Sequence, residues 1–410
     1  MLRNFAGISS LALGAALLAC GGSGSNGEWA GVVEDSAGVA IVRNPDTGIW
    51  DDANRWTVEE VLRIGSETEA EYQFGMIAGL DVDSEGNIHV LDQMGQRVQV
   101  YDEAGTWLRT IGRGGSGPGE LSPAVSAILV TPGDSVIVID LMQQRGNVYL
   151  ADGSYAADFS VPMSEGLPIR FSRIGAGTFV EQTRMIPVPG EAATSSGVIR
   201  TRDSGGSIED TLMTLPPTES FTIDGQTPRF VIFAPEQLWT VIGDSRIALA
   251  YNNEYRVGIH GTDGALQTVI VRSVESDEVT PADERMLLDR MRELMAAQGV
   301  PPEGLQQIMS AMEFAERYPV LSDVMGGPDG TLWVQRVAPA EEFELGGGIE
   351  EAFDLGAQEW DVYDPDGRFL GQVVLPDRFR PLRLHGSSIY GILRDELGVQ
   401  NVAKLEIRRP

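Results

Sequence analysis

The feature that most constrains the fold of this chain is a repeated pair of apolar segments joined by a tight acidic turn. Residues 77–92 give the clearest copy, with the turn at Asp83 to Asn87. The same shape returns at residues 127–140, 171–180, 238–250, 324–335 and 382–393. Apolar residues that alternate along a segment indicate β-strands, and Asp and Gly at the tips indicate hairpin turns. The chain therefore contains six copies of one strand-turn-strand unit.

A second hairpin follows most of these copies. It is clearest at residues 98–111 and 360–373, where Tyr101 and Tyr363 each precede an acidic, glycine-containing turn. Weaker versions lie at residues 147–159, 198–212 and 256–269. Two hairpins make a four-stranded unit, which cannot bury both of its faces alone. Six such units in succession predict an all-β fold, a six-bladed β-propeller.

The last unit lacks one strand at the C-terminus. After residues 382–393 only one further strand is predicted, at Val402 to Ile407, before the sequence ends. An apolar alternating segment, Trp56 to Gly65, precedes the first complete unit. We expect this N-terminal strand to pair beside Val402 to Ile407 and so to close the last blade of the ring.

One region does not follow the strand pattern. Between Val271 and Leu321 the apolar residues recur with the period of a helix. Thr280 to Asp283 is a good helix start, with a capping threonine, a proline at the first helical position and a carboxylate three residues after the cap. Gly299 ends this helix, and Pro301-Pro302 starts another. The sequence predicts a helical hairpin, at about residues 280–317, inserted between blades.

The residues around the first unit resemble a known family. They comprise the strand-Asp-x-x-Gly-Asn-strand-Asp pattern at Asp83 to Asp92, Arg97, and the glycine-rich segment 112–121. This combination resembles the six-bladed β-propellers of the NHL-repeat type, and among them bacterial lipoproteins known by that fold. The resemblance extends from about residue 38 to the end and implies one propeller domain over residues 38–410.

The N-terminus has the pattern of an export signal. A basic residue, Arg3, is followed by an apolar stretch at residues 11–19, too short to span a bilayer. The stretch ends at Leu17-Leu18-Ala19-Cys20, which resembles the bacterial lipobox, and Cys20 is the single cysteine of the chain. We expect a signal peptide over residues 1–19, then a lipidated Cys20 and a flexible tether over residues 20–37. An ordinary secretory signal is the alternative.

The expected location follows from this anchor. A lipid on Cys20 would hold the exported chain at the cell envelope, with the membrane as its first partner. The residue after Cys20 is Gly21 and not Asp. By resemblance to the sorting of enteric lipoproteins, this residue favours the outer membrane.

The charge of the chain excludes one class of partner. The sequence has 60 acidic and 30 basic residues, a net charge of −30. Nucleic acid and anionic lipid head groups are repelled by such a chain on average. We therefore expect no DNA or RNA partner. After the N-terminal stretch, no segment reaches the roughly 18 consecutive apolar residues that a membrane span needs.

The candidate ligand-binding residues are mostly arginines in predicted loops. Aspartate and arginine recur five residues apart between the second and third strands of a unit. Arg113, Arg336 and Arg394 fall at comparable loop positions. The full candidate set is Asp92, Arg97, Arg113, Asp140, Arg145, Arg336 and Arg394. Each Asp/Arg pair suits a structural clamp across a turn. Alternatively, arginines gathered on one face of the ring suit an anionic ligand.

Metal and catalytic sites are weakly indicated. Asp81, Asp83, Glu85 and Asp92 have the spacing of an EF-hand calcium loop, but their flanks alternate as strands, which favours a hairpin turn. The three histidines, His89, His260 and His385, form no HxxxH or HExxH motif. We expect no resident cofactor, with calcium as the alternative, and the sequence shows no residue set that indicates catalysis.

The fold prediction leaves two functional hypotheses. The first is a binding or scaffolding propeller at the cell envelope, which recognises a protein, a peptide or a glycan. The second is a propeller hydrolase or lyase of the lactonase kind, with a metal in the central channel. The second needs three or four carboxylate, amide or imidazole side chains that converge on the channel. The sequence favours the binding protein over the enzyme.

Overall fold

The computed structural model describes residues 28–175, 177–185, 195–218, 220–224, 227–297, 299–339 and 355–410. The expected signal peptide, Cys20 and the tether as far as Gly27 lie outside these residues. In the part of the chain that is described, no helix is both long and apolar enough to cross a membrane.

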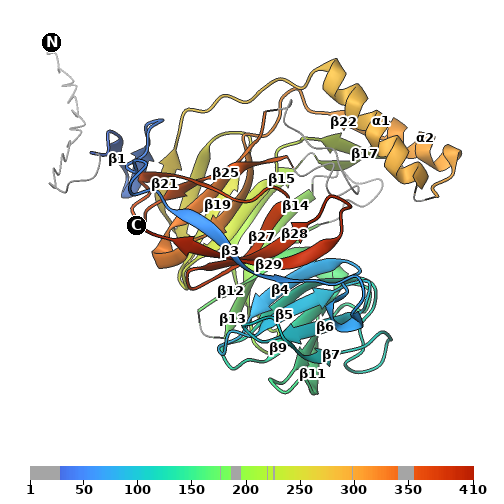
Figure 1. The fold of residues 1–410 in the computed structure, drawn as a ribbon. Coiled ribbons are helices and arrows are strands. Elements are labelled where there is room, and N and C mark those ends of the chain that lie inside the picture. Colours follow the sequence, from blue (N-terminus) through green and yellow to red (C-terminus); the bar gives the residue numbers. More distant parts are fainter. Residues whose placement is uncertain are drawn as a thin grey trace, which may run out of the picture.

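The described strands form six four-stranded blades around a central axis, which confirms the predicted all-β propeller (Figure 1). Blade 1 contains β4 (Ile77–Val82), β5 (Ile88–Asp92), β6 (Arg97–Tyr101) and β7 (Trp107–Ile111). Blade 2 contains β8 (Val125–Val130), β9 (Val136–Asp140), β10 (Arg145–Tyr149) and β11 (Tyr155–Ser160). Blade 3 contains β12 (Leu167–Ile174), β13 (Thr178–Arg184), β14 (Ser195–Asp203) and β15 (Ile208–Thr218).

The second half of the ring has the same order. Blade 4 contains β18 (Gln237–Ile242), β19 (Arg246–Tyr251), β20 (Arg256–Gly261) and β21 (Leu266–Val271). Blade 5 contains β23 (Leu321–Gly326), β24 (Leu332–Val337), β25 (Gly356–Tyr363) and β26 (Phe369–Val374). Blade 6 contains β27 (Phe379–His385), β28 (Ser388–Arg394), β29 (Gln400–Arg408) and β3 (Thr57–Ile64). The first strand of each blade is the innermost one.

The repeated Asp-x-x-Gly turns explain why the hairpins form where they do. Asp83 Oδ1 accepts hydrogen bonds from the backbone N–H groups of Glu85 (3.0 Å) and Asn87 (2.8 Å). Gly86 takes a φ of 85°, a conformation that costs little only for glycine. The same pair of acceptor contacts, to the residues two and four positions further on, recurs at Asp102, Asp203, Asp364 and Asp395.

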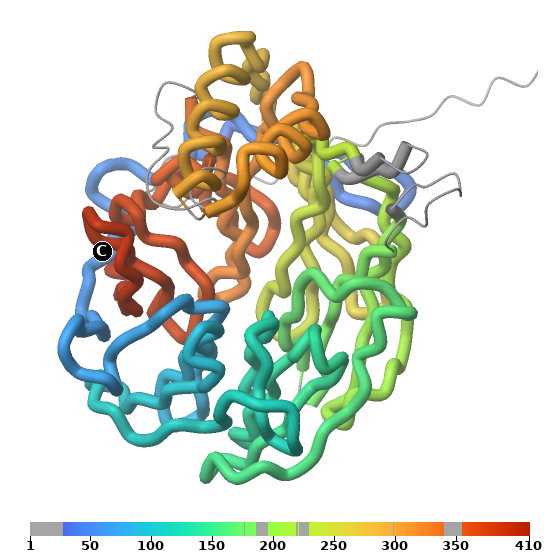
Figure 2. The backbone as a smooth tube through the Cα atoms, turned by 90° about the vertical axis from the view of Figure 1, so that its right-hand side faces the viewer, coloured from blue at the N-terminus to red at the C-terminus, as the bar shows by residue number. Residues whose placement is uncertain are grey.

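The N-terminal strand closes the last blade, as predicted. β3 pairs antiparallel with β29, in a register that runs from Ile64 opposite Val402 to Thr57 opposite Arg408. The Ile64 side chain is 2% exposed and packs in one core cluster with residues of blades 1 and 6. In Figure 2 the C-terminal strands, in red, lie beside the blue and cyan part of the chain. The first and last segments therefore meet in one blade.

A segment ahead of β3 binds the outer edges of other blades. The hairpin β1 (Val32–Ser36) and β2 (Val39–Arg43) adds to blade 4, where β2 runs parallel to β21. Asn44, which follows β2, contacts blade 5, because its Nδ2 donates a hydrogen bond to the Gly367 carbonyl at 2.9 Å. The Trp50 N–H donates to the Leu370 carbonyl at 2.7 Å. Residues 28–56, which we call the strap, thus tie blades 4 and 5 to blade 6.

The predicted helical hairpin is confirmed between blades 4 and 5. It consists of α1 (Pro281–Ala297) and α2 (Pro302–Ser310), and the Asp283 N–H donates to the capping Thr280 Oγ1 at 3.3 Å. The helices share a core of Met291, Met295 and Leu305. β22 (Met312–Phe314) pairs with β17 (Thr227–Ile232), which also pairs with β16 (Phe221–Asp224). We call these two helices and three strands the cap (Figure 1).

Candidate functional site

The ring has two faces of very different construction. The turn face carries the short connections between the first and second strands and between the third and fourth, for example residues 83–87, 102–106 and 386–387. The loop face carries the connections between the second and third strands and between consecutive blades. Its connections include residues 112–124 and the entire cap. Among the residues that the structure describes, the long insertions between strands therefore emerge on the loop face.

Asp92 and Arg97 form a clamp on the loop face. Asp92 is 1% exposed, and its Oδ1 accepts the N–H groups of Gly75 (3.1 Å) and Gly95 (3.0 Å). Arg97 Nε lies 3.3 Å from Asp92 Oδ2, and Arg97 Nη2 donates to the Gln73 carbonyl at 2.9 Å. The pair fastens the loop that enters blade 1 to a turn of the same blade.

Asp140 and Arg145 hold the next loop without binding each other. Asp140 accepts the Ser122 N–H at 2.7 Å and the Ser122 hydroxyl at 2.6 Å. Arg145 Nη2 donates to the carbonyls of Gly117 (2.6 Å) and Glu120 (2.9 Å). The two side chains therefore secure residues 112–124 at separate points. In both blades the recurrent Asp/Arg spacing reflects side chains that anchor a loop. The aspartate and arginine bind each other directly in blade 1, whereas in blade 2 they bind separate partners.

The remaining three candidates lie on the loop face of different blades. Arg113 pairs with Glu120 (Nη2 to Oε1, 2.9 Å), and its side chain is 81% exposed. Arg336, near the end of β24, has its Nε 3.5 Å from Asp361 Oδ2 and is 35% exposed. Arg394 is the last residue of β28. Of these, Arg113 offers the most guanidinium surface to a ligand in solution.

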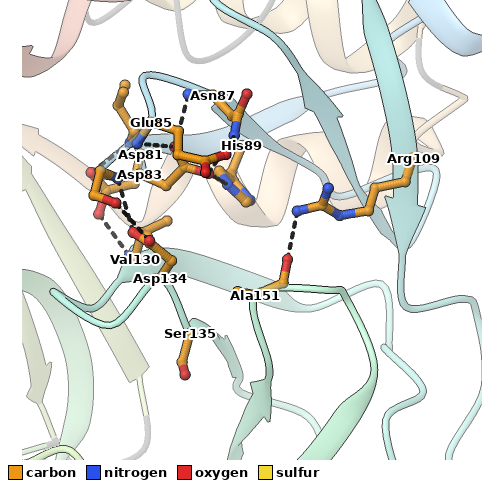
Figure 3. A network of polar contacts seen from close by, with 12 residues as sticks. Asp81, Asp83, Glu85, Asn87, His89, Arg109, Val130, Asp134, Ser135 and Ala151 are labelled. Atoms are coloured by element: carbon orange, nitrogen blue, oxygen red, sulfur yellow. Dashed lines mark hydrogen bonds and ion pairs between the residues drawn. The ribbon is translucent and has the colours of Figure 1, made fainter.

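The residues with calcium-loop spacing belong to a β-hairpin. Asp81 lies opposite His89, whereas Asp92 lies opposite Ile77 at the other end of the β4–β5 pair. Asp83 binds its own turn and His89 Nε2 (3.0 Å) (Figure 3). Desolvation by burial lowers the pKa of His89 despite this contact, which keeps the imidazole neutral near pH 7. Among the residues described, no three His, Cys, Asp or Glu side chains gather into a metal site.

An arc of one ion pair and two hydrogen bonds runs along the innermost strands and was not predicted from the sequence. Arg383 on β27 places its Nε 2.9 Å from Asp81 Oδ1 on β4. Asp81 Oδ2 accepts the Val130 N–H of β8 at 2.8 Å (Figure 3). Arg173 Nη1 on β12 donates to the Val130 carbonyl at 2.7 Å. This axial arc of Arg383, Asp81, Val130 and Arg173 joins blades 6, 1, 2 and 3 across the ring closure.

A second contact crosses the other side of the axis. Arg170 Nη1 on β12 lies 3.5 Å from Asp323 Oδ1 on β23, and these side chains are 39% and 35% exposed. Arg170 and Arg383 hold equivalent places, since each comes two residues after a proline, Pro168 or Pro381, at a register shift in its strand. This repeated Pro-x-Arg was the sequence signal that could have located both arginines.

Charged groups of both signs act on the arginines of the axial arc. Burial is the largest cause that lowers the pKa of Arg173; Asp81 opposes this effect and Arg383 adds to it. Burial, followed by Arg383, also lowers the pKa of His385. The carboxylates of Asp81, Asp134 and Asp244 oppose the effect of burial on Arg173, so groups of both charges act at the turn-face end of the axis.

Comparison with known proteins supports the fold. A family model described as a 6-bladed beta-propeller matches residues 57–169, which contain β3 and blades 1 and 2. A Bacteroides fragilis NCTC 9343 protein classed as exported is 13% identical, with 90% of this chain and 99% of that chain covered, at a TM-score of 0.51. A DUF4221 family member from Bacteroides vulgatus ATCC 8482 is 10% identical, with 87% and 99% covered, at a TM-score of 0.55.

These similarities define the architecture and no activity. At 13% and 10% sequence identity, the two Bacteroides proteins show that the chain shares their fold and nothing more. Virginiamycin B lyase from Staphylococcus aureus, in a catalytically inactive form, is 10% identical, with 86% of this chain and 99% of that chain covered, at a TM-score of 0.43. That likeness is too distant to bear on chemistry. No curated protein matches the sequence.

Proposed function

We propose that this chain is an exported lipoprotein that binds a protein, peptide or glycan at the cell envelope through its loop face. Cys20 would carry the lipid, and Gly21 after it favours the outer membrane. The propeller serves as a rigid ring that presents loops. Function on such rigid scaffolds is commonly carried by the loops, because they can vary without disturbing the core.

The observation that carries this proposal is the asymmetry of the two faces. The turn face has only tight connections in the described blades, whereas the loop face holds the cap and residues 112–124. Asp140 and Arg145 keep residues 112–124 in a fixed position, and Asp92 and Arg97 do the same for the neighbouring loop that enters blade 1. Arg113, held by Glu120, would then contact an acidic or polar group of the ligand.

The proposal is tested with Cys20→Ala, with Ser23→Ala as the matched control in the same tether. We expect wild type and Ser23→Ala to sediment with the envelope fraction and to retain bound partners in native pull-downs after detergent solubilisation. Cys20→Ala should melt at the same temperature yet leave the membranes, because it lacks the thiol that accepts the lipid. Retention of Cys20→Ala in the membrane fraction would contradict the anchor.

A further inference from the structure

The three most exposed large apolar side chains of the described residues lie in equivalent turns of the loop face. They are Leu397 (84% exposed), Met94 (68%) and Met142 (64%), whereas the next, Val374, is 48% exposed. Each lies between the second and third strands of its blade, and these blades, 6, 1 and 2, follow one another around the ring. Single exposed apolar residues are ordinary, but a repeated position points to a binding surface. We call these three residues the apolar tips.

The turns do not need the apolar tips for their own conformation. Asp92 Oδ1 accepts the Gly95 N–H at 3.0 Å, and Asp140 makes the corresponding contact in blade 2. In blade 6, Asp395 Oδ1 accepts the N–H groups two and four residues further on, both at 2.9 Å. The backbone and these carboxylates make the turns, so the fold itself gives no reason for an apolar side chain at each tip.

Contacts between blades hold the three turns together as one surface. Gln93 of blade 1 and Gln143 of blade 2 both donate through Nε2 to carbonyls of residues 112–124, each at 2.9 Å. Gln400, directly after the turn of blade 6, accepts the Ile77 N–H of blade 1 at 2.7 Å. In Figure 2 the cap, in gold and orange, lies at the top of the ring, whereas blades 1 and 2, in cyan and teal, lie at the bottom. The apolar tips therefore form a preformed surface that the cap leaves uncovered.

The charges beside the apolar tips determine which partner fits. Four exposed carboxylates of the adjoining loops form no ion pair within the described residues: Glu67, Glu69, Glu71 and Glu396. The arginines of the same face, by contrast, already bind a carboxylate or a backbone carbonyl, as Arg97, Arg113 and Arg145 do. A second copy of this chain, with its net charge of −30, would be repelled, and a neutral glycan would gain nothing from the carboxylates. A polypeptide with basic residues is complementary to them.

We propose that the apolar tips bind a basic amphipathic segment of a protein partner, with its apolar side chains on Leu397, Met94 and Met142 and its Lys or Arg residues on the four carboxylates. Methionine suits such a surface, because its flexible, polarisable side chain adapts to differently shaped apolar groups. This inference rests on the proposed loop-face function and narrows its ligand from a protein, peptide or glycan to a basic polypeptide.

The test is fluorescence anisotropy of a labelled peptide made of two Leu-Lys-Lys-Leu-Leu-Lys-Leu repeats, titrated with the purified protein. We expect the peptide to bind, and to bind about tenfold more weakly or less when serine replaces every leucine or glutamate replaces every lysine. The tip variant, which combines Met94→Ser, Met142→Ser and Leu397→Ser, should lose peptide binding by a similar factor while it melts like wild type.

The matched control combines Leu150→Ser, Ile208→Ser and Leu266→Ser. These side chains are also exposed (47%, 42% and 39%), but they lie in or next to connections of the turn face. The control should bind the peptide as wild type does. The proposal is overturned if wild type does not bind the peptide, if the tip variant binds it equally well, or if wild type binds chitohexaose, a neutral glycan, in its place.

The proposed loop-face function is judged by a separate readout, photo-cross-linking of the anchored protein to its native partner from Met286 of the cap. Cross-links that are lost in the tip variant would support both. Cross-links that persist in the tip variant would leave the loop-face function standing and contradict the role of the apolar tips.

Discussion

A chain that begins at residue 67 is expected to lose cooperative unfolding, whereas a chain of residues 28–410 keeps it. Without β3, the β29 strand loses its whole outer partner, from Ile64 opposite Val402 to Thr57 opposite Arg408. The core around blades 1 and 6 loses Ile64, a buried side chain worth about 1.5–3 kcal/mol. Loss of the strap also exposes the outer edges of blades 4 and 5. Thermal melting followed by circular dichroism measures the difference.

The chain of residues 28–410 is the control for this experiment, because it lacks the N-terminal segment but keeps the strap and β3. If the chain of residues 67–410 gave the same sharp transition at the same temperature, the N-terminal closure would not be needed for stability. That result would count against the assignment of β3 as the last strand of blade 6.

Asp361→Ala is expected to destabilise the protein by about 3–5 kcal/mol, because it leaves a buried arginine without its carboxylate. Asp361 is fully buried and accepts hydrogen bonds from Arg272 Nη1 (2.7 Å), the Tyr255 hydroxyl (2.8 Å) and Gln372 Nε2 (2.9 Å). Although desolvation lowers the pKa of Arg272, Tyr363 and Asp361 raise it above its ordinary value. Arginine keeps its charge in proteins, so the Arg272 guanidinium stays charged when Asp361 is removed. Urea unfolding measures the loss.

Asp366→Ala is the matched control for that substitution. The Asp366 side chain is 70% exposed on a turn of the same blade, and its Oδ2 lies 3.9 Å from Arg368 Nη2. We expect its unfolding curve to stay close to that of wild type, since exposed ion pairs contribute little. Equal curves for Asp361→Ala and wild type would show that the buried network between blades 4 and 5 carries no net stability.

Local sequence patterns predicted the hairpins well because each one has its own turn chemistry. Asp83 and Gly86 determine a turn through contacts within five residues, so the pattern is readable without knowledge of the fold. The helix start at Thr280 is equally local. The closing strand was predictable for a different reason. One blade lacked a strand, and Trp56 to Gly65 was the apolar alternating segment left to supply it.

The features that escaped prediction depend on partners far apart in the sequence. β2 pairs with β21, more than two hundred residues away, and nothing local marks Ala40 to Arg43 as its partners. The residues of the axial arc lie on four different blades, and their contacts exist only once the ring is closed. Among the predicted loop-face residues, the sequence did not separate the buried Asp92 from the exposed Arg113, since both occupy similar positions next to turns.

The most direct test of the central claim is site-specific photo-cross-linking of the anchored protein in its own envelope. A photoreactive residue would replace Ser116 or Met286 on the loop face, where these side chains are exposed, or Glu103 on a turn of the opposite face. The account predicts one discrete cross-linked species from a loop-face position and none from Glu103. Cross-links from Glu103 alone, or equal cross-links from both faces, would contradict binding through the loop face.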